Sequence, residues 1–199
     1  MPLPVLFAIS VAFGLAVWGA VAWNYIWPAL RERPSPGNLK PILLLHGFRF
    51  LGLAFILPGI VSPDLPTAFS RPVAYGDLIT AILALLALAT LASPIGTAVT
   101  WVFNIFGTAD LLYGFYLGGR LSLPDNVGML GAGYFILAAY VPLLLITHGL
   151  AFRILLGWRT PVSRVRSAQG TPLSRSSACE VGQSIPCAIK SRRVSSPAV

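Results

Sequence analysis

The sequence predicts an all-α fold, a polytopic bundle of transmembrane helices that crosses the bilayer five times. Three observations predict it. The mean hydropathy is +0.78 and only 10% of the residues are charged, a composition that fits no soluble domain. Five apolar stretches each have about the 20 residues that a helix needs to cross roughly 30 Å of hydrocarbon. The cations lie mainly between and after these stretches, as in multi-pass membrane proteins. The predicted spans are residues 5–27, 39–60, 73–93, 96–117 and 128–156.

The chain divides into a bundle at residues 1–158 and a tail at residues 159–199. From Thr160 onward the composition changes to Ser, Arg, Pro, Gly and Val, without an aromatic residue. Such a segment buries too little apolar surface to offset its ordering entropy, so we expect a disordered basic tail. Cys179 and Cys187 lie in this tail, and two cysteines at this spacing indicate neither a disulfide framework nor a metal site.

The first span, residues 5–27, carries small residues at every fourth position, a pattern that lets another helix approach closely. These packing residues are Ala8, Ala12, Ala16 and Ala20. The span also has an alternative interpretation as a signal peptide, because Ala20-Val21-Ala22 is similar to a cleavage site. Against cleavage, no Lys or Arg precedes the apolar run and the run continues beyond that site.

The connections between spans are rich in proline and glycine, which end helices. We expect the helix before Pro28 to stop there and a turn to lead to the second span. The connection from Pro58 to Pro72 is expected to be stiff and extended. Ser93 and Pro94 predict a tight turn that makes the third and fourth spans antiparallel neighbours. Gly114 and Gly118 end the fourth span with a spacing typical of close helix contact.

The distribution of Lys and Arg predicts the orientation. The first loop holds three of them and the C-terminal segment from Arg153 onward holds eight, whereas the second and fourth loops hold one each. Since short cytoplasmic loops are enriched in cations, the N-terminus is predicted outside and the C-terminus in the cytoplasm.

Charged residues inside the spans are the first candidate site. Arg49 lies near the middle of its span, Asp110 just beyond the middle of the fourth, and Asp77 nearer the outer edge of the third. An ionised Arg or Asp at a helix centre costs roughly 2.5 to 3.5 kcal/mol on insertion, so each needs a partner or a watery cavity. We therefore predict a buried pair of Arg49 with Asp110 or Asp77. This pair is either a structural link between helices or part of a ligand or proton site.

The histidines are the second candidate site. His46 and His148 lie roughly 10 Å and 12 Å from the cytoplasmic ends of their spans, so they can face each other. They could line a polar cavity together with Asn104. Alternatively, they are axial ligands of the iron of a b-type haem, with Arg49 near a propionate. A hydrogen-bonded packing role is also open.

No phosphate loop, His-Glu-x-x-His or Cys-x-x-Cys motif is present. An enzyme stays open, because intramembrane sites assemble from residues distant in sequence, but a protein that is not an enzyme is the expected case. Several runs resemble small multi-pass bacterial membrane proteins without an assigned activity. These runs are Leu45-His46-Gly47-Phe48-Arg49, Pro58-Gly59-Ile60-Val61-Ser62-Pro63, Ala74-Tyr75-Gly76-Asp77-Leu78, Phe103-Asn104 through Asp110-Leu111-Leu112, and Val141-Pro142 through His148. The resemblance implies a location in the bacterial cytoplasmic (inner) membrane. A looser similarity to the DoxX-like group, which is linked to redox and quinone chemistry, rests on an Arg-Gly-rich span followed by a Gly-Asp-led one.

Three functions remain open from the sequence. The leading hypothesis is an integral membrane protein whose buried polar cluster binds or passes a small ligand or a proton. The first alternative is a haem- or quinone-associated redox component that uses His46 and His148. The second is a structural subunit that docks through the alanine stripe and Gly114/Gly118, as a homo-oligomer or with a membrane partner. The lipid bilayer is the expected environment, and nucleic acid is not an expected partner because the cations lie in loops and tail.

Overall fold

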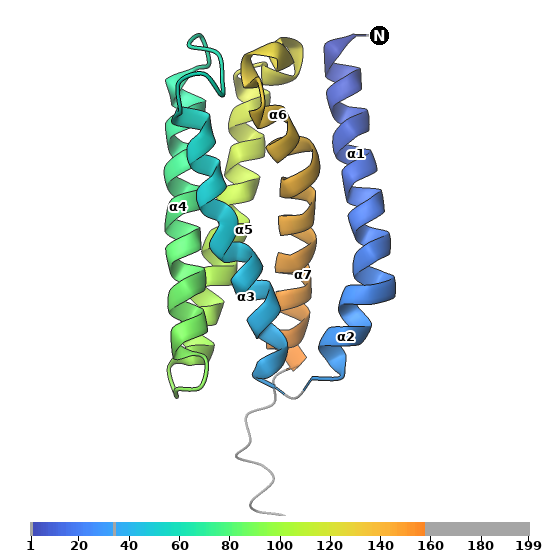
Figure 1. Cartoon of the computed structure of the whole chain (residues 1–199), viewed down its shortest axis with the longest axis vertical. Coiled ribbons are helices and arrows are strands. Elements are labelled where there is room, and N and C mark those ends of the chain that lie inside the picture. Colours follow the sequence, from blue (N-terminus) through green and yellow to red (C-terminus); the bar gives the residue numbers. More distant parts are fainter. Residues whose placement is uncertain (1, 34, 158–199) are drawn as a thin grey trace, which may run out of the picture. The chain divides into compact units, whose positions relative to one another are not determined.

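The computed structural model describes residues 2–33 and 35–157, and in this part of the chain it is all-helical (Figure 1). The predicted tail, with Cys179 and Cys187, lies outside the described residues. The long helices run alongside one another, and the chain reverses direction at short connections at the two ends.

The first helical run is longer than predicted. Helix α1 (Leu3–Val21), a π-helical turn (Ala22–Ile26) and α2 (Trp27–Arg31) follow without a break. The expectation that the helix stops before Pro28 is therefore wrong. Proline lacks the N–H of an i→i−4 bond and its ring crowds the carbonyl four residues earlier, and the wider π-helical turn directly before it absorbs both defects.

The second run changes its helix type half way. A short 3₁₀ turn (Gly37–Leu39) leads into α3 (Lys40–Gly47), which continues as a 3₁₀ helix (Phe48–Ile56). The predicted end at residue 60 is four residues too late, because Leu57 is already extended. A 3₁₀ helix of nine residues is unusually long, and such stretches inside a helix often mark a functional or strained position.

Helices α4 (Thr67–Thr90) and α5 (Gly96–Arg120) are joined by the predicted tight turn and pack side by side. Helix α4 begins six residues before the predicted residue 73, so Pro72 lies inside the helix and not in a loop. Since barely one turn precedes Pro72, it removes only one intrahelical hydrogen bond.

The last run begins after a 3₁₀ segment (Leu123–Leu130) and consists of α6 (Gly133–Phe135), a π-helical turn (Ile136–Tyr140) and α7 (Val141–Gly157). It starts five residues later than the predicted residue 128, since Gly131 has a left-handed φ of 50°. The connection over residues 57–66 is pinned to this region by backbone hydrogen bonds. Ser62 N donates to Met129 O at 2.9 Å, and Ala132 N donates to Ile60 O at 3.1 Å.

Four of these helical runs are long enough and apolar enough to cross a membrane: Leu3–Arg31, Gly37–Ile56, Thr67–Thr90 and Gly133–Gly157. Helix α5 has 25 residues but is not among them. Asn104 and Asp110 lower its hydropathy. Its length matches that of its neighbours, and its polar residues face the interior of the bundle.

The interior has an apolar layer at each end and a polar layer between them. One apolar cluster is built around Leu43 and Phe103, and the other around Phe55 and Phe69. Between these clusters lie Arg49, Asp77, Asn104 and His148, whereas the buried Thr100 lies on the far side of Phe103 along α5. The chain therefore places its buried charge at mid-height.

Helix α1 attaches to the π-helical turn of the last run. Trp18 Nε1 donates to Ala139 O at 2.9 Å, and a Cβ added to Gly14 would overlap the carbonyl oxygen of Ala138. The alanines at positions 8, 12, 16 and 20 are all exposed. No described helix packs on them, so their role in docking another chain stays a prediction.

Replacing Gly14 with leucine should push α1 away from the bundle and lower stability by about 1–3 kcal/mol, the usual cost of overpacking. Gly19→Leu is the matched control on the same helix, since nothing lies within 4 Å of a Cβ there. Thermal unfolding of the purified full-length variants measures the difference. Equal stability of the two variants would contradict this attachment.

Candidate functional site

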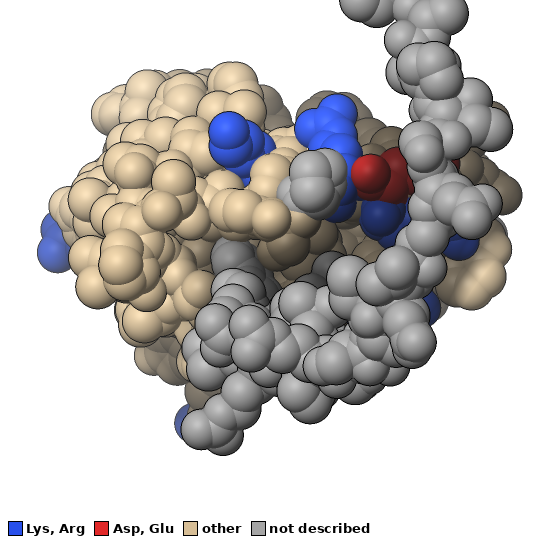
Figure 2. Space-filling view, turned by 90° about the horizontal axis from the view of Figure 1, so that it is seen from below, with Lys and Arg blue, Asp and Glu red and all other residues tan. Residues whose placement is uncertain are grey.

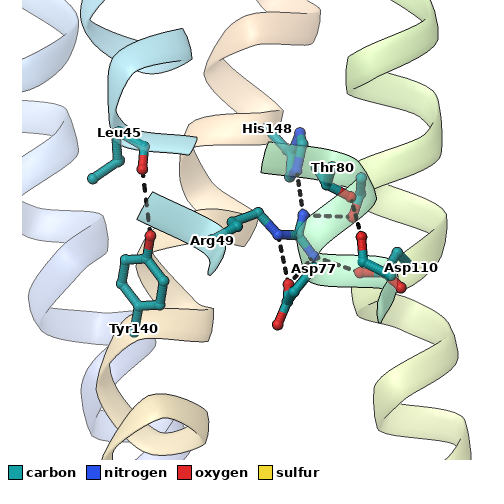
Figure 3. Close-up of polar contacts among 9 residues, drawn as sticks. Leu45, Arg49, Asp77, Thr80, Asp110, Tyr140 and His148 are labelled. Atoms are coloured by element: carbon teal, nitrogen blue, oxygen red, sulfur yellow. Dashed lines mark hydrogen bonds and ion pairs between the residues drawn. The ribbon is translucent and has the colours of Figure 1, made fainter. Parts of the chain in front are cut away.

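Arg49 occupies the centre of the polar layer. It is the second residue of the 3₁₀ helix, and the residue as a whole is 1% exposed. Its side chain extends toward α4, α5 and α7 (Figure 3). A charged residue buried to this degree must be fully paired, because an unpaired ion in a low-dielectric interior is strongly unfavourable.

Each nitrogen of the guanidinium has an acceptor, through four hydrogen bonds and one further ion-pair contact. Nε donates to Asp77 Oδ1 at 2.7 Å, and Nη2 reaches the same oxygen at 2.6 Å. Nη2 also donates to Asp110 Oδ2 at 2.6 Å. Nη1 donates to the carbonyl of Gly107 at 3.1 Å and to His148 Nε2 at 3.2 Å. The planar fork of arginine is thus satisfied in every direction.

The sequence prediction of a buried arginine–aspartate pair is confirmed in an extended form. Arg49 pairs with Asp77 and with Asp110 at the same time, instead of with one of them. The two carboxylates come from adjacent helices, α4 and α5, so the ion cluster joins three segments of the chain.

The contact with Arg49 fixes the protonation of His148. Arginine can only donate, so His148 Nε2 must accept and the ring is neutral with its proton on Nδ1. That proton is donated to Asn104 Oδ1 at 2.7 Å, and Asn104 Nδ2 donates back to the carbonyl of His148 at 3.4 Å. The predicted grouping of Asn104 with His148 is therefore present and links α5 to α7.

His46 forms the next part of the polar layer. Thr147 Oγ1 already donates to the carbonyls of Leu143 and Leu144, so it accepts from His46 Nε2, 3.0 Å away. His46 Nδ1 is then left as a buried acceptor without a partner among the described residues. The His46 ring packs against His148 at a tilt, with 4.2 Å between the ring centroids and 47° between the ring planes, and Phe103 packs against both rings.

The two histidines do not fit the axial ligands of a haem in this arrangement. Metal–imidazole bonds are about 2 Å long, so an iron with its porphyrin between two imidazoles holds their ligating nitrogens roughly 4 Å apart on opposite sides. Here the rings pack directly on each other, and both Nε2 atoms are engaged in hydrogen bonds. The described residues also contain no group of three His, Cys, Asp or Glu suited to a metal ion.

Three glycines make room for the ion cluster. A Cβ added to Gly52 would overlap the Asp77 carboxylate, one on Gly76 would overlap that of Asp110, and one on Gly107 would overlap the His148 ring. Sequence reasoning assigned the glycines to general packing and missed this role. The available signal was their spacing, since each lies beside or three residues from a charged residue of the cluster.

A cavity of about 170 Å³ adjoins the two carboxylates. Apart from Asp77 and Asp110 its walls are apolar side chains and backbone. The other lining residues are Phe7, Phe55, Phe69, Val73, Leu111, Gly114, Phe115, Gly118, Gly119, Leu123, Pro124, Leu137 and Val141. Gly114 and Gly118, predicted as helix contacts, therefore open this cavity.

A scan of protein-family models matches residues 6–156 to the family described as Domain of unknown function (DUF8737). The chain belongs to this family. The matched region contains every residue of the ion cluster and of the cavity. No curated protein and no solved structure matches the chain.

Replacing Arg49 with glutamine should lower stability by about 3–5 kcal/mol, because two buried carboxylates lose their counter-charge. Adding Asp77→Asn and Asp110→Asn to the same chain should restore much of this loss, since no uncompensated charge then remains. Thermal unfolding and the monodisperse fraction of purified protein report the effect. A triple variant no more stable than Arg49→Gln would show that charge pairing is not what holds these residues.

Replacing Gly76 with alanine should cost more than 1 kcal/mol, because the methyl group displaces the Asp110 carboxylate. Gly114→Ala on α5 is the matched control, because its nearest neighbour, Val73 Cγ2, would lie at an ordinary 3.5 Å. The free energy of unfolding of the two variants, compared with the unchanged chain, tests the fit. Equal losses would contradict it.

Proposed function

We propose that the chain is an integral protein of the bacterial cytoplasmic membrane with five spans, in which α5 is the fifth crossing helix. The burial pattern supports this, because it is the reverse of that of a soluble protein. Arg49, His46 and Asn104 are buried, whereas Phe13 is 69% exposed and Leu156 is 76% exposed. Large apolar side chains on the outer surface are stable when lipid is the solvent.

The position of the cations supports an outside N-terminus and a cytoplasmic C-terminus. Lys and Arg side chains gather at the end of the bundle where α2 ends and α3 begins (Figure 2). Arg31 and Arg153 line one pocket at this end. At the opposite end, α4 begins near Arg71 and α5 ends at Arg120.

Single cysteines on either side of α5 test this topology, in a chain in which Cys179 and Cys187 are replaced by serine. Ser93 and Asp125 flank α5 and are exposed. A membrane-impermeant maleimide should label Asp125→Cys in intact bacterial cells and Ser93→Cys only after permeabilisation. Labelling of both from the same side would overturn the proposal that α5 crosses the membrane.

Within this bundle, the proposed activity is binding of a proton or a small cation at the ion cluster. One guanidinium faces two carboxylates, and both histidines are neutral, so the fully ionised cluster carries one excess negative charge. A net charge inside the bilayer is expensive. Uptake of a single positive charge makes the cluster neutral.

The observation that carries this proposal is that the guanidinium is more completely paired than the two carboxylates. Each guanidinium nitrogen has an acceptor, whereas Asp77 Oδ2 and Asp110 Oδ1 have no hydrogen-bond partner among the described residues. Both aspartates line the cavity, and Arg49 does not. A purely structural ion pair has no need of a second carboxylate beside a cavity.

Infrared difference spectroscopy of the purified full-length protein should show the carbonyl band of one protonated carboxyl that disappears as the pH is raised. Asp110→Asn should remove this band, because the remaining Arg49–Asp77 pair is neutral. Asp64→Asn, in an exposed loop, is the matched control and should leave it unchanged. A protein without a titrating carboxyl band that depends on Asp77 or Asp110 would overturn the proposed proton site.

A docking role remains a second candidate function. The exposed alanine stripe on α1 is an apolar face that no described part of the chain covers. It supports a partner helix or a second copy as the occupant. Gly114 and Gly118 line the cavity, and their role in docking stays a prediction.

A further inference from the structure

We propose that the cavity beside Asp77 and Asp110 is a binding site for a small hydrophobic amine, held as its ammonium cation. The ammonium group would lie on the two carboxylates and the hydrocarbon part would fill the apolar space. This inference rests on the proposed cation-binding role of the ion cluster and names the chemical class of its ligand.

The walls of the cavity come from separate parts of the chain. Phe7 belongs to α1, Phe55 to the 3₁₀ helix, Phe69 to α4 and Phe115 to α5. Four aromatic rings around one space favour a hydrophobic ligand, and aromatic faces also attract cations. Water alone would have few polar partners along these walls.

The two carboxylates that line the cavity select the sign of the ligand's charge. Among the described residues, Asp77 and Asp110 are the only polar side chains that line it, and ionised carboxylates only accept hydrogen bonds. Arg49 does not line the cavity, and each of its guanidinium nitrogens already has an acceptor. An anionic ligand would meet like charge, and a neutral acceptor would find no side-chain donor. The ligand must bring its own N–H donors and its own positive charge.

The volume sets the size of the hydrocarbon part. The cavity measures about 170 Å³, slightly more than the engineered apolar cavity of about 150 Å³ that binds benzene. A single aromatic ring with one carbon and an ammonium group therefore fits. Benzylamine is a probe of this size, and benzyl alcohol and benzoate are its neutral and anionic counterparts.

The amine and the proton neutralise the same charge, so they compete. With both carboxylates ionised, the ammonium satisfies their free oxygens and the excess negative charge disappears. With one carboxyl protonated, the cluster is already neutral and the amine would add a net positive charge. Binding of one ammonium at the ion cluster thus releases one proton.

Isothermal titration calorimetry of the purified full-length protein in detergent tests the proposal. Benzylamine should bind at least tenfold more tightly than benzyl alcohol, and benzoate should not bind. Asp110→Asn should remove the preference for the amine, whereas Asp64→Asn should keep it. Comparable affinity for benzylamine and benzyl alcohol in the unchanged protein would overturn the proposal.

A second variant guards against loss of folding in Asp110→Asn. Gly118→Leu places a side chain in the cavity without touching the ion cluster, since the nearest atoms to its Cβ are 3.9 Å away on Leu123 and Phe69. It should abolish binding of benzylamine. Gly149→Leu is the control, because Gly149 is exposed on α7 and nothing lies within 4 Å of its Cβ. Binding that survives Gly118→Leu unchanged would place the amine elsewhere.

The infrared measurement separates the two proposals. A titrating carboxyl band that benzylamine leaves unchanged would keep the proton site and overturn the amine site. Loss of the band in the presence of benzylamine supports both, because the bound ammonium has displaced the proton. Absence of the band in the unchanged protein would overturn the proton site. The calorimetric measurement alone would then decide whether benzylamine binds.

Discussion

The structure depends on the complete pairing of one buried arginine. Arg49 makes four hydrogen bonds to acceptors on three other helices, so its side chain links the 3₁₀ helix to α4, α5 and α7 at mid-height. Lipid tails are as apolar as the helix surfaces, so hydrophobic contact gives little preference for one neighbour over another. A hydrogen-bonded charge supplies that preference.

The remaining features of the interior follow from this pairing. Glycine replaces a larger residue wherever a carboxylate or imidazole must fit between helices, as at positions 52, 76 and 107. The tighter 3₁₀ backbone carries Arg49 and Gly52 past α4 at close range. The hydrogen bonds of His148 to Asn104 then fix the acceptor nitrogen that faces the guanidinium. The 3₁₀ backbone, the small glycine residues and the position of the His148 proton all help to hold Arg49 against Asp77 and Asp110.

Much of this could be predicted from the sequence, because the free energy of burying charge in lipid is large and local. This free energy means that Arg49 needs an acidic partner, and the sequence offers only two aspartates inside the predicted spans. What the sequence could not supply was helix rotation and start position. Asp77 was placed near the outer edge, but α4 begins at Thr67 and brings it to mid-helix. The cavity was missed for the same reason, since its walls come from helices whose facing sides are set only by tertiary packing.

Helix α1 differs from its neighbours in how little of it the bundle encloses. In the helical run Leu3–Arg31, only 6% of an apolar 18-residue stretch is buried, against 39–44% of the corresponding stretches in the other candidate spans. None of the residues of α1 belongs to the ion cluster. Yet it supplies Phe7 to the cavity wall. A sideways displacement of this single helix would open the wall of the cavity formed by Phe7 while every hydrogen bond of Arg49 stayed intact. Under the proposed membrane topology, the route between the two aspartates and their surroundings would then lead through the hydrophobic phase, where amphiphiles are concentrated.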